Sequence, residues 1–456
     1  MSRIFKTADY DATLDVTVRL GDCLPPDHLA RFVVDTIAHL DLSAIYTRYG
    51  SRGGQPYAPQ ILLGLLFYGY ATGVFSTRKL ERATYESVPF RFIAGNLHPD
   101  HDTLATFRKT FLPELKDLFV QVLLLAQLAG VLKLGNISLD GTKIHADASK
   151  SRAVSYKHLL ALEAQLRAEV EELFALSERA EQGELPDGLV VSDEIAIRQA
   201  RLVRLAQAKA VLDARAYERD AREQAEYDAK VQERADTAQR TRRTPRGRPP
   251  KAPTLGPRDK DQYNFTDPES RIMKHSSSEG FEQDYNAQIA VDQASLLIVG
   301  ESLSNHPTDQ HEADPTLDAI PPDLGTPDAA ALDTGYFSTA NIAAFERRDI
   351  EPYIATGRDP HHPSWQDRFA ALPAPPADDA SPMVKMAYKL KTVLGKAIYG
   401  LRKCTVEPVI GIIKEVLGFR QFSLRGEQAA GGEWCLVCLA FNLKRLHTLL
   451  TGEVCR

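Results

Sequence analysis

Cysteine, methionine and tryptophan are scarce in this chain of 456 residues, which contains five, four and two of them. An odd number of scattered cysteines argues against a disulfide framework and for a reducing compartment. Cys435 and Cys438 form a CxxC motif, but the sequence has no second Cys or His pair at zinc spacing. Because both lie in the apolar stretch WCLVCLAFNL, we expect small core residues of a helix rather than redox or metal chemistry.

Long apolar runs and a strong charge of one sign are also absent. The most apolar window, 61–75, is shorter than the roughly 18 to 20 residues that span a bilayer. The N-terminus has no apolar segment of the kind that directs secretion. The formal charge is −6, from 61 acidic and 55 basic residues, so any contact with nucleic acid must come from local basic patches. We therefore expect a cytoplasmic protein without membrane contact.

The first part of the chain, to about residue 130, has helical patterns. Apolar residues recur at helical spacing from Leu29 to Leu40. Three more helical stretches are predicted at 59–72, 77–86 and 103–128, with a cap at Asp102 or Thr103 and a break near Pro113. Arg108 and Lys109 make the start of the last one basic. A helix, a turn and a basic helix are typical of a DNA-binding unit, and equally of a helical bundle with a charged surface.

From about residue 135 the pattern changes to that of strands. The segments are NISLDGTKIHA, a hairpin in 284–305 with a turn near 293–295, AAALDTGYFS and EPYIAT. Helices at about 309–320 and 338–348 separate the later strands, and 384–450 is helical again. A strand, a hairpin and strand-helix-strand repeats predict an α/β fold with a sheet of mixed direction.

A long insert, about 150–275, separates the first strand from the hairpin. Narrow apolar seams on either side of GELPDG (183–188) predict an antiparallel pair of helices. The following stretch, 237–262, is almost without apolar residues, so we expect it to be disordered or extended. It contains RGRPPK, in which Arg246 and Arg248 are similar to the core of an AT-hook that enters the minor groove. A linker of no special function fits this short basic stretch equally well.

Two aspartates share one local pattern. Asp140 and Asp333 each follow an apolar strand, with Gly141 directly after the first and Gly335 two residues after the second. We expect both at strand ends, where sites in α/β sheets gather. Each alone is typical of a turn or a helix cap, and the repetition of the pattern favours a shared site.

A third carboxylate, Glu407, stands before Pro408 and is expected at the entry of a helix, where the helix dipole favours it. Three carboxylates on strand, strand and helix are what a two-metal phosphoryl-transfer site needs, and Mg²⁺ and Mn²⁺ prefer oxygen ligands. His145 and Asp147 lie in the same stretch as Asp140. On a continuing strand His145 points to the opposite face, and Asp147 is too far along to share the first metal.

Together these motifs resemble the DDE transposases of bacterial insertion sequences, with their RNase H-like catalytic fold. The resemblance covers nearly the whole chain, from YAPQILLGLLFYGYATG and PDHDTLATFR through LDGTKIHADAS and ALDTGYFS to VEPVIGIIKEVLGFRQFSLRG. It implies that Asp140, Asp333 and Glu407 are the catalytic residues and hold two Mg²⁺ or Mn²⁺ ions. It also implies contact with double-stranded DNA, both at the terminal inverted repeats and at the target. It further implies that the active complex is at least a homodimer and that the protein is associated with the bacterial nucleoid.

Relatives carry a signature of tyrosine, arginine, glutamate and lysine around the last carboxylate. Glu407 and Lys414 fit its spacing, whereas the arginine position is Lys403, with Arg402 beside it, and the tyrosine is offset to Tyr399. A basic residue here suits a DNA phosphate next to the metals. Two further candidates for phosphate contact, which also fit ordinary solvated charges, are Lys414 and Arg425.

The resemblance implies a domain order: a helical DNA-binding domain at 1–130, the start of the catalytic domain at 131–150, a helical-hairpin insertion at 151–275 and the remaining catalytic domain at 276–456. The implied reaction is cleavage at the element ends followed by joining of the 3′-hydroxyl to target DNA. Two alternatives are a nuclease of the same fold without strand transfer and a non-catalytic DNA-binding protein derived from a transposase.

Overall fold

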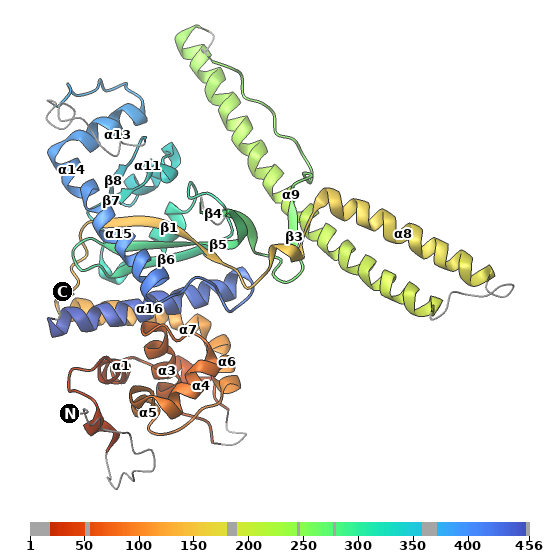
Figure 1. The fold of residues 1–456 in the computed structure, drawn as a ribbon. Coiled ribbons are helices and arrows are strands. Elements are labelled where there is room, and N and C mark those ends of the chain that lie inside the picture. Colours follow the sequence, from red (N-terminus) through yellow and green to blue (C-terminus); the bar gives the residue numbers. More distant parts are fainter. Residues whose placement is uncertain are drawn as a thin grey trace, which may run out of the picture.

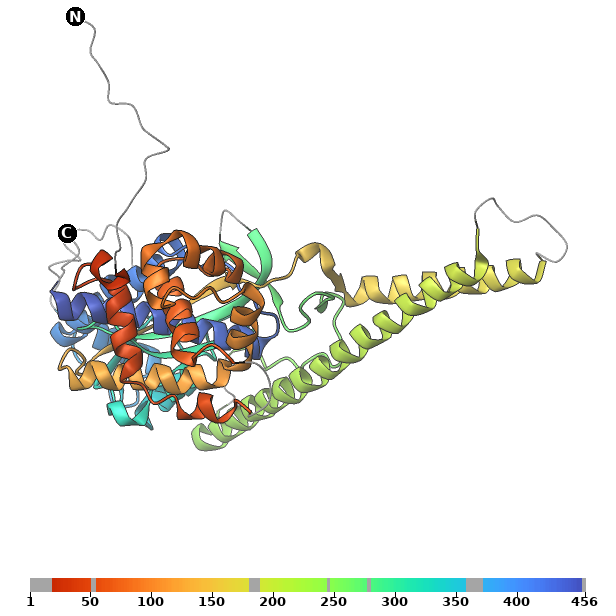
Figure 2. The ribbon, with the colours of Figure 1, turned by 90° about the horizontal axis from the view of Figure 1, so that it is seen from below.

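The computed structural model describes residues 19–50, 55–179, 189–243, 247–276, 280–357 and 372–452. A mixed sheet with helices lies at the centre, the N-terminal helices lie on one side of it, and a pair of long helices extends away from the body (Figures 1 and 2). The chain is therefore a mixed α/β protein, as the pattern of strands and helices predicts.

The N-terminal part consists of short helices around α3, which is apolar and buried on nearly every side. A break between α6 and α7 falls at Phe111, with Pro113 in the first turn of α7, so the break predicted near Pro113 is confirmed. The cap of α6 is Asp100, which accepts from the Thr103 amide at 2.7 Å, rather than Asp102 or Thr103. The elements are η1 (Leu20–Cys23), α1 (Leu29–Ala38), α2 (Ser43–Thr47), α3 (Pro59–Ala71), α4 (Thr77–Glu86), α5 (Val88–Ile93), α6 (His101–Thr110) and α7 (Leu112–Leu128).

The central sheet has the order β4-β5-β1-β7-β8, and β6 also pairs with β5. Its strands are β1 (Ile137–His145), β4 (Arg271–Ser276), β5 (Gly280–Asp292), β6 (Ile298–Ser304), β7 (Ala329–Leu332) and β8 (Glu351–Ile354). The pairs of β5 with β1, β4 and β6 are antiparallel, whereas β7 runs parallel to β1 and β8. The predicted hairpin is β5 and β6, and β4 is a strand that the sequence pattern missed.

Asp140 lies inside β1, not at its end as predicted. All nine residues of β1 pair with β5, and Gly141 stands opposite Gln288. The glycine is needed there for space, because a Cβ on Gly141 would lie 2.1 Å from Gln288 Nε2. Gly141 therefore makes room for a neighbouring side chain and does not open the end of the strand.

The two predicted helices between 150 and 275 are α8 (Tyr156–Arg179) and α9 (Val191–Thr241), with β2 (Ala153–Ser155) and β3 (Gln262–Asn264) paired at their base. Leu159 and Leu166 of α8 pack against Leu205 and Leu212 of α9. The helix α9 has 51 residues, about 75 Å at 1.5 Å per residue. It includes 237–241, where a disordered or extended chain was predicted, because helix-forming residues continue it beyond the apolar seam.

The last part of the chain connects the sheet to the N-terminal helices. Its elements are α10 (Ala313–Asp318), η3 (Pro322–Leu324), η4 (Thr334–Tyr336), α11 (Thr339–Glu346), α13 (Pro382–Lys391), α14 (Val393–Gly400), α15 (Arg402–Gly411), the π-helical turn η5 (Ile412–Val416) and α16 (Glu427–Thr451). The helix α16 packs against β6 on one side and against α3 and α7 on the other (Figure 1). Cys435 and Cys438 are fully buried in it, so the prediction of core residues is confirmed. Among the described helices, none is both long and apolar enough to cross a membrane.

Candidate active site

Asp140 lies within β1, and Asp333 directly follows the neighbouring parallel strand β7. Ser138 of β1 pairs with Ala331 of β7. Two residues further along, Asp140 is still in β1 and Asp333 directly follows β7, and the charge of Asp333 acts on the Asp140 carboxyl. The prediction that Asp333 follows its strand is confirmed, because β7 ends at Leu332 and the Asp333 carboxylate caps η4 by accepting from the Gly335 amide at 2.8 Å.

The helix α15 covers the face of β1 from which Asp140 projects. Thr405 donates to Ser138 at 2.8 Å, two residues before Asp140 on the same face of the strand. Arg402, the first residue of α15, donates through Nη1 to Asp140 Oδ2 at 2.8 Å and through Nη2 to Glu407 Oε1 at 3.4 Å. One guanidinium thus joins the strand carboxylate to the helix carboxylate.

The charge state of Asp140 reflects this setting. Burial raises the pKa of the Asp140 carboxyl to about 6, the Arg402 guanidinium works against that rise, and the negative charge of Asp333 adds to it. A carboxyl that is costly to ionise alone is stabilised as an anion by any added cation. The site is therefore suited to positive charge beyond that of Arg402.

Glu407 lies inside α15 and not at its entry, so that part of the prediction is wrong. The helix begins five residues earlier at Arg402, and Pro408 is inside it. The Glu407 side chain is half exposed, at 50%. It faces both solvent and Arg402, and is the most open of the carboxylates that contact this arginine.

The basic residues near the site divide by exposure. Arg402 is buried against the carboxylates, whereas its neighbour Lys403 is exposed. Lys414 donates to Thr142 Oγ1 and to the Lys143 carbonyl, each at 3.2 Å, and so lies along β1. The exposed Arg425 donates to the Asp147 carboxylate at 2.9 Å. Asp147, beyond the end of β1, is thus engaged in an ion pair.

Among the more distant candidates, the prediction that Arg108 contacts DNA is wrong. It is buried in α6 and donates to the Tyr70 hydroxyl at 2.6 Å, with Glu433 of α16 at 3.5 Å. The Arg108 charge is paired inside the core and does not face solvent, because a buried cation requires such partners. Lys109 and Arg248 are exposed, and Arg246 lies outside the described residues.

Sequence reasoning missed a second polar group beside the aspartates, centred on Asp309. Its Oδ1 accepts from Asn286 Nδ2 at 2.7 Å, Gln288 Nε2 at 2.9 Å and Lys143 Nζ at 3.3 Å. A Cβ placed on Gly335 would lie 3.0 Å from Asp333 Oδ1 and 3.6 Å from Asp309 Oδ2, so the two carboxylates flank this glycine. The sequence signal for this group was the pair of amides Asn286 and Gln288, which are buried in the mostly apolar second half of β5.

Comparison with protein families gives two matches. A model described as a transposase domain (DUF772) matches residues 18–110, and one described as a transposase DDE domain matches 380–447. Both segments are thus similar to transposase domains, and the second to the DDE domain. The second match includes Arg402 and Glu407, whereas Asp140 and Asp333 lie outside both matched segments. Comparison with curated proteins and with solved structures gave no match.

The match to a DDE transposase domain supports a metal-dependent enzyme that processes DNA, since DDE transposases generally use divalent metal ions. The donor set fits such ions, since carboxylate oxygens are the ligands that Mg²⁺ and Mn²⁺ prefer. The raised pKa of Asp140 fits as well, because the burial that disfavours the bare anion favours its neutralisation by a cation.

Proposed function

We propose that this protein is a transposase that binds the terminal repeats of its element, cleaves the DNA at the element ends and joins the 3′-hydroxyl to target DNA. The observation that carries the proposal is that the parallel pair β1 and β7 brings Asp140 and Asp333 near each other, together with the contact of Arg402 with both Asp140 and Glu407. These three carboxylates come from three separate elements and point toward one region. Such convergence supports a shared catalytic role.

Two Mg²⁺ or Mn²⁺ ions are proposed at these carboxylates. Asp140, Asp333 and Glu407 would hold these ions through their carboxylate oxygens. Bound divalent ions would activate the attacking oxygen and stabilise the leaving oxygen of an in-line displacement.

The protein's own cations are proposed to hold the carboxylates and the DNA. Arg402 keeps Asp140 and Glu407 together by charge-assisted hydrogen bonds. Lys403 is exposed on the same helix and is available to a phosphate oxygen. Lys414, which lies along β1 beside Thr142, would neutralise a phosphate that approaches from the side of α15.

The arrangement of elements supports an RNase H-like catalytic domain. The strand that bears Asp140 lies between antiparallel β5 and parallel β7, and α15 covers its face. In this proposal α8 and α9 form an insertion between β1 and β4, residues 1–130 bind the terminal repeats, and Lys109, Arg248 and Arg425 are further DNA contacts. Handling two DNA ends at once requires at least a homodimer.

The deciding experiment is cleavage of DNA that carries the element's own ends, in Mg²⁺ or Mn²⁺. We expect wild-type protein to yield both cleaved and strand-transfer products and Asp333→Ala to yield neither. Asp328→Ala is the matched control, because Asp328 is an exposed aspartate beside the other end of β7. Full activity of Asp333→Ala, or activity in EDTA, would overturn the proposal.

The same assay separates the two alternatives. Cleaved ends without joined products would indicate a nuclease. Binding of the ends without cleavage by the wild-type protein would indicate a non-catalytic DNA-binding protein.

A further inference from the structure

Two histidines and an aspartate form a compact cluster at the far end of β1. His145 Nδ1 lies 2.7 Å from Asp284 Oδ1, and His275 Nδ1 lies 3.0 Å from Asp284 Oδ2. The imidazole rings are stacked, with centroids 4.1 Å apart and planes 19° apart. One ligand atom from each of the three residues lies within 4.8 Å of the others. We propose that His145, His275 and Asp284 bind a divalent transition-metal ion such as Zn²⁺, at a site separate from the catalytic carboxylates.

Three adjacent strands build this cluster. His145 is the last residue of β1 and pairs directly with Asp284 of β5. His275 belongs to β4 on the other side of β5, where the register shifts between Lys274 and Ser276. A β-bulge re-aims the extra side chain. It thereby allows His275 to reach the same carboxylate as His145, so a bound ion would connect all three strands.

The donor atoms suit zinc better than magnesium. Imidazole nitrogen is a preferred ligand of Zn²⁺, whereas Mg²⁺ selects oxygen. With Zn–N bonds of about 2.0 to 2.1 Å, donors around a tetrahedral ion lie about 3.3 Å apart. The two observed spacings to the Asp284 carboxylate are close to that value. Small side-chain rotations would therefore open the cluster around an ion, which would take the place of the hydrogen bonds between the ring nitrogens and the carboxylate.

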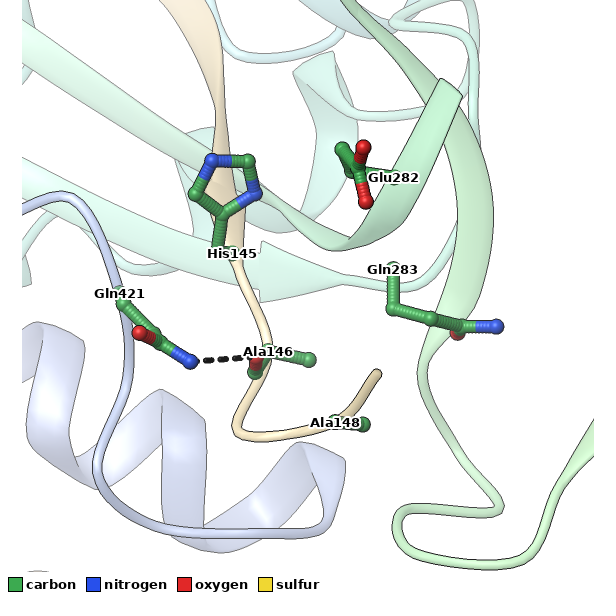
Figure 3. Close-up of a pocket in the computed structure, with 6 residues that line it drawn as sticks. All are labelled: His145, Ala146, Ala148, Glu282, Gln283 and Gln421. Atoms are coloured by element: carbon green, nitrogen blue, oxygen red, sulfur yellow. Dashed lines mark hydrogen bonds between the residues drawn. The ribbon is translucent and has the colours of Figure 1, made fainter. Parts of the chain in front are cut away.

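Burial favours a fixed geometry and still leaves access. The Asp284 side chain is fully buried, His275 is 7% exposed and His145 is 30% exposed. A cavity of roughly 360 Å³ lies beside His145 and is also lined by Glu282 and Gln421 (Figure 3). The cavity reaches His145, the most exposed of the three proposed ligands, so an ion and its water ligands would enter from this side.

The cluster is distinct from the site at Asp140. The five-residue step from Asp140 to His145 spans about 16 Å and places their side chains on opposite faces of β1. No side chain is shared between the two groups. Loss of metal at one should therefore leave the other able to bind.

The test is Zn²⁺ binding by the untagged full-length protein after chelation, measured by calorimetry in excess Mg²⁺. We expect His275→Ala and His145→Ala to lose one Zn²⁺ per chain that wild type and Asp333→Asn bind. The matched control is His306→Ala, which removes another histidine paired with a carboxylate, Glu312, at 2.8 Å. It should bind as wild type does.

Two further readouts keep the test independent of folding and of activity. Co²⁺ should give visible absorption bands typical of nitrogen ligands in wild type and Asp333→Asn, and not in His275→Ala. Zn²⁺ should raise the melting temperature of wild type and not of His275→Ala, whose circular dichroism checks the fold. Equal Zn²⁺ stoichiometry in wild type and folded His275→Ala, or displacement of Zn²⁺ by millimolar Mg²⁺, would overturn the proposal.

Discussion

Arg402 and Asp140 are 262 positions apart in the chain, and their side chains meet at 2.8 Å between Nη1 and Oδ2. The same guanidinium reaches Glu407 at 3.4 Å. A protein cation thus lies between two of the carboxylates at which we propose that metal ions bind. The ions and the guanidinium would compete for the same oxygens.

Replacing Arg402 should therefore have a metal-dependent effect on stability. We expect Arg402→Gln to lower the free energy of unfolding in EDTA by about 3 kcal/mol, because removing one partner of a buried ion pair leaves the other uncompensated. Mg²⁺ should reduce this loss by supplying positive charge. Lys403→Gln, at the exposed neighbouring position, should change stability by less than about 0.5 kcal/mol. Urea titrations with and without Mg²⁺ measure the stability of both variants. If Mg²⁺ leaves the loss of stability in Arg402→Gln unchanged, the ions do not bind at the carboxylates that Arg402 contacts.

Asp309 should matter for activity more than for folding. Asp309→Asn keeps the shape of the side chain but removes the charge opposite Lys143 and next to Asp333. We expect DNA cleavage to fall about tenfold, which is about 1.4 kcal/mol in the activation barrier. Asp314→Asn, in a partly exposed pair with Arg348, is the control and should cleave as wild type does. Wild-type cleavage by Asp309→Asn would remove this residue from the site.

Glu301 should make stability depend on pH. Burial raises the pKa of this glutamic acid to about 7 from its usual 4.5. The folded state keeps a proton that the unfolded state releases between these values, so stability falls as pH rises through that window. The loss above pH 7 is about 3 kcal/mol, at 1.36 kcal/mol for each unit of pKa. Glu301→Gln should therefore be more stable than wild type at pH 8 and equal to it near pH 4.

Melting temperatures at the two pH values test this prediction. Glu346→Gln, at an exposed position of α11, should show no pH-dependent difference from wild type. A Glu301→Gln protein that gains no stability at pH 8 would mean that the buried carboxylate is fully compensated by its neighbours.

The adjacent pair Arg108 and Lys109 should respond in opposite ways. Arg108→Gln should lower stability by about 3 kcal/mol, because it leaves the buried Glu433 without its cation. Lys109→Gln should leave stability unchanged and weaken DNA binding evenly across sequences, with a salt slope lower by about one. Binding at several salt concentrations and urea titrations separate the two effects. A normal salt slope for Lys109→Gln would exclude it as a phosphate contact.

The strands β1 and β7 and the two aspartates were predictable because their signals are local. Apolar alternation marks β1, a short apolar run marks β7, and an aspartate with a nearby glycine marks each candidate. The position of Asp140 within its strand was not predictable, because the role of Gly141 depends on Gln288, a residue far along the chain. Pro408 misled in a similar way, since it suggests a helix entry while α15 begins at Arg402.

Two parts of the site depend on tertiary structure alone. Successive residues on a helix point about 100° apart, so the sequence does not tell whether Arg402 or Lys403 faces β1. Asp309 lies in a loop without periodicity, and its partners come from β1 and β5 through their register. The sequence pattern within one segment does not indicate that residues from three separate segments come into contact.

The position of α16 makes the two matched segments parts of one folding unit. Residues 18–110 and 380–447 are far apart in the chain, yet α16 packs on α3 and α7, and a Cβ on Gly432 would lie 2.8 Å from Leu112. Cutting the chain near residue 130 would expose the apolar surfaces of both pieces to water. Neither fragment should stay soluble alone, whereas the two expressed together should reassemble around this helix.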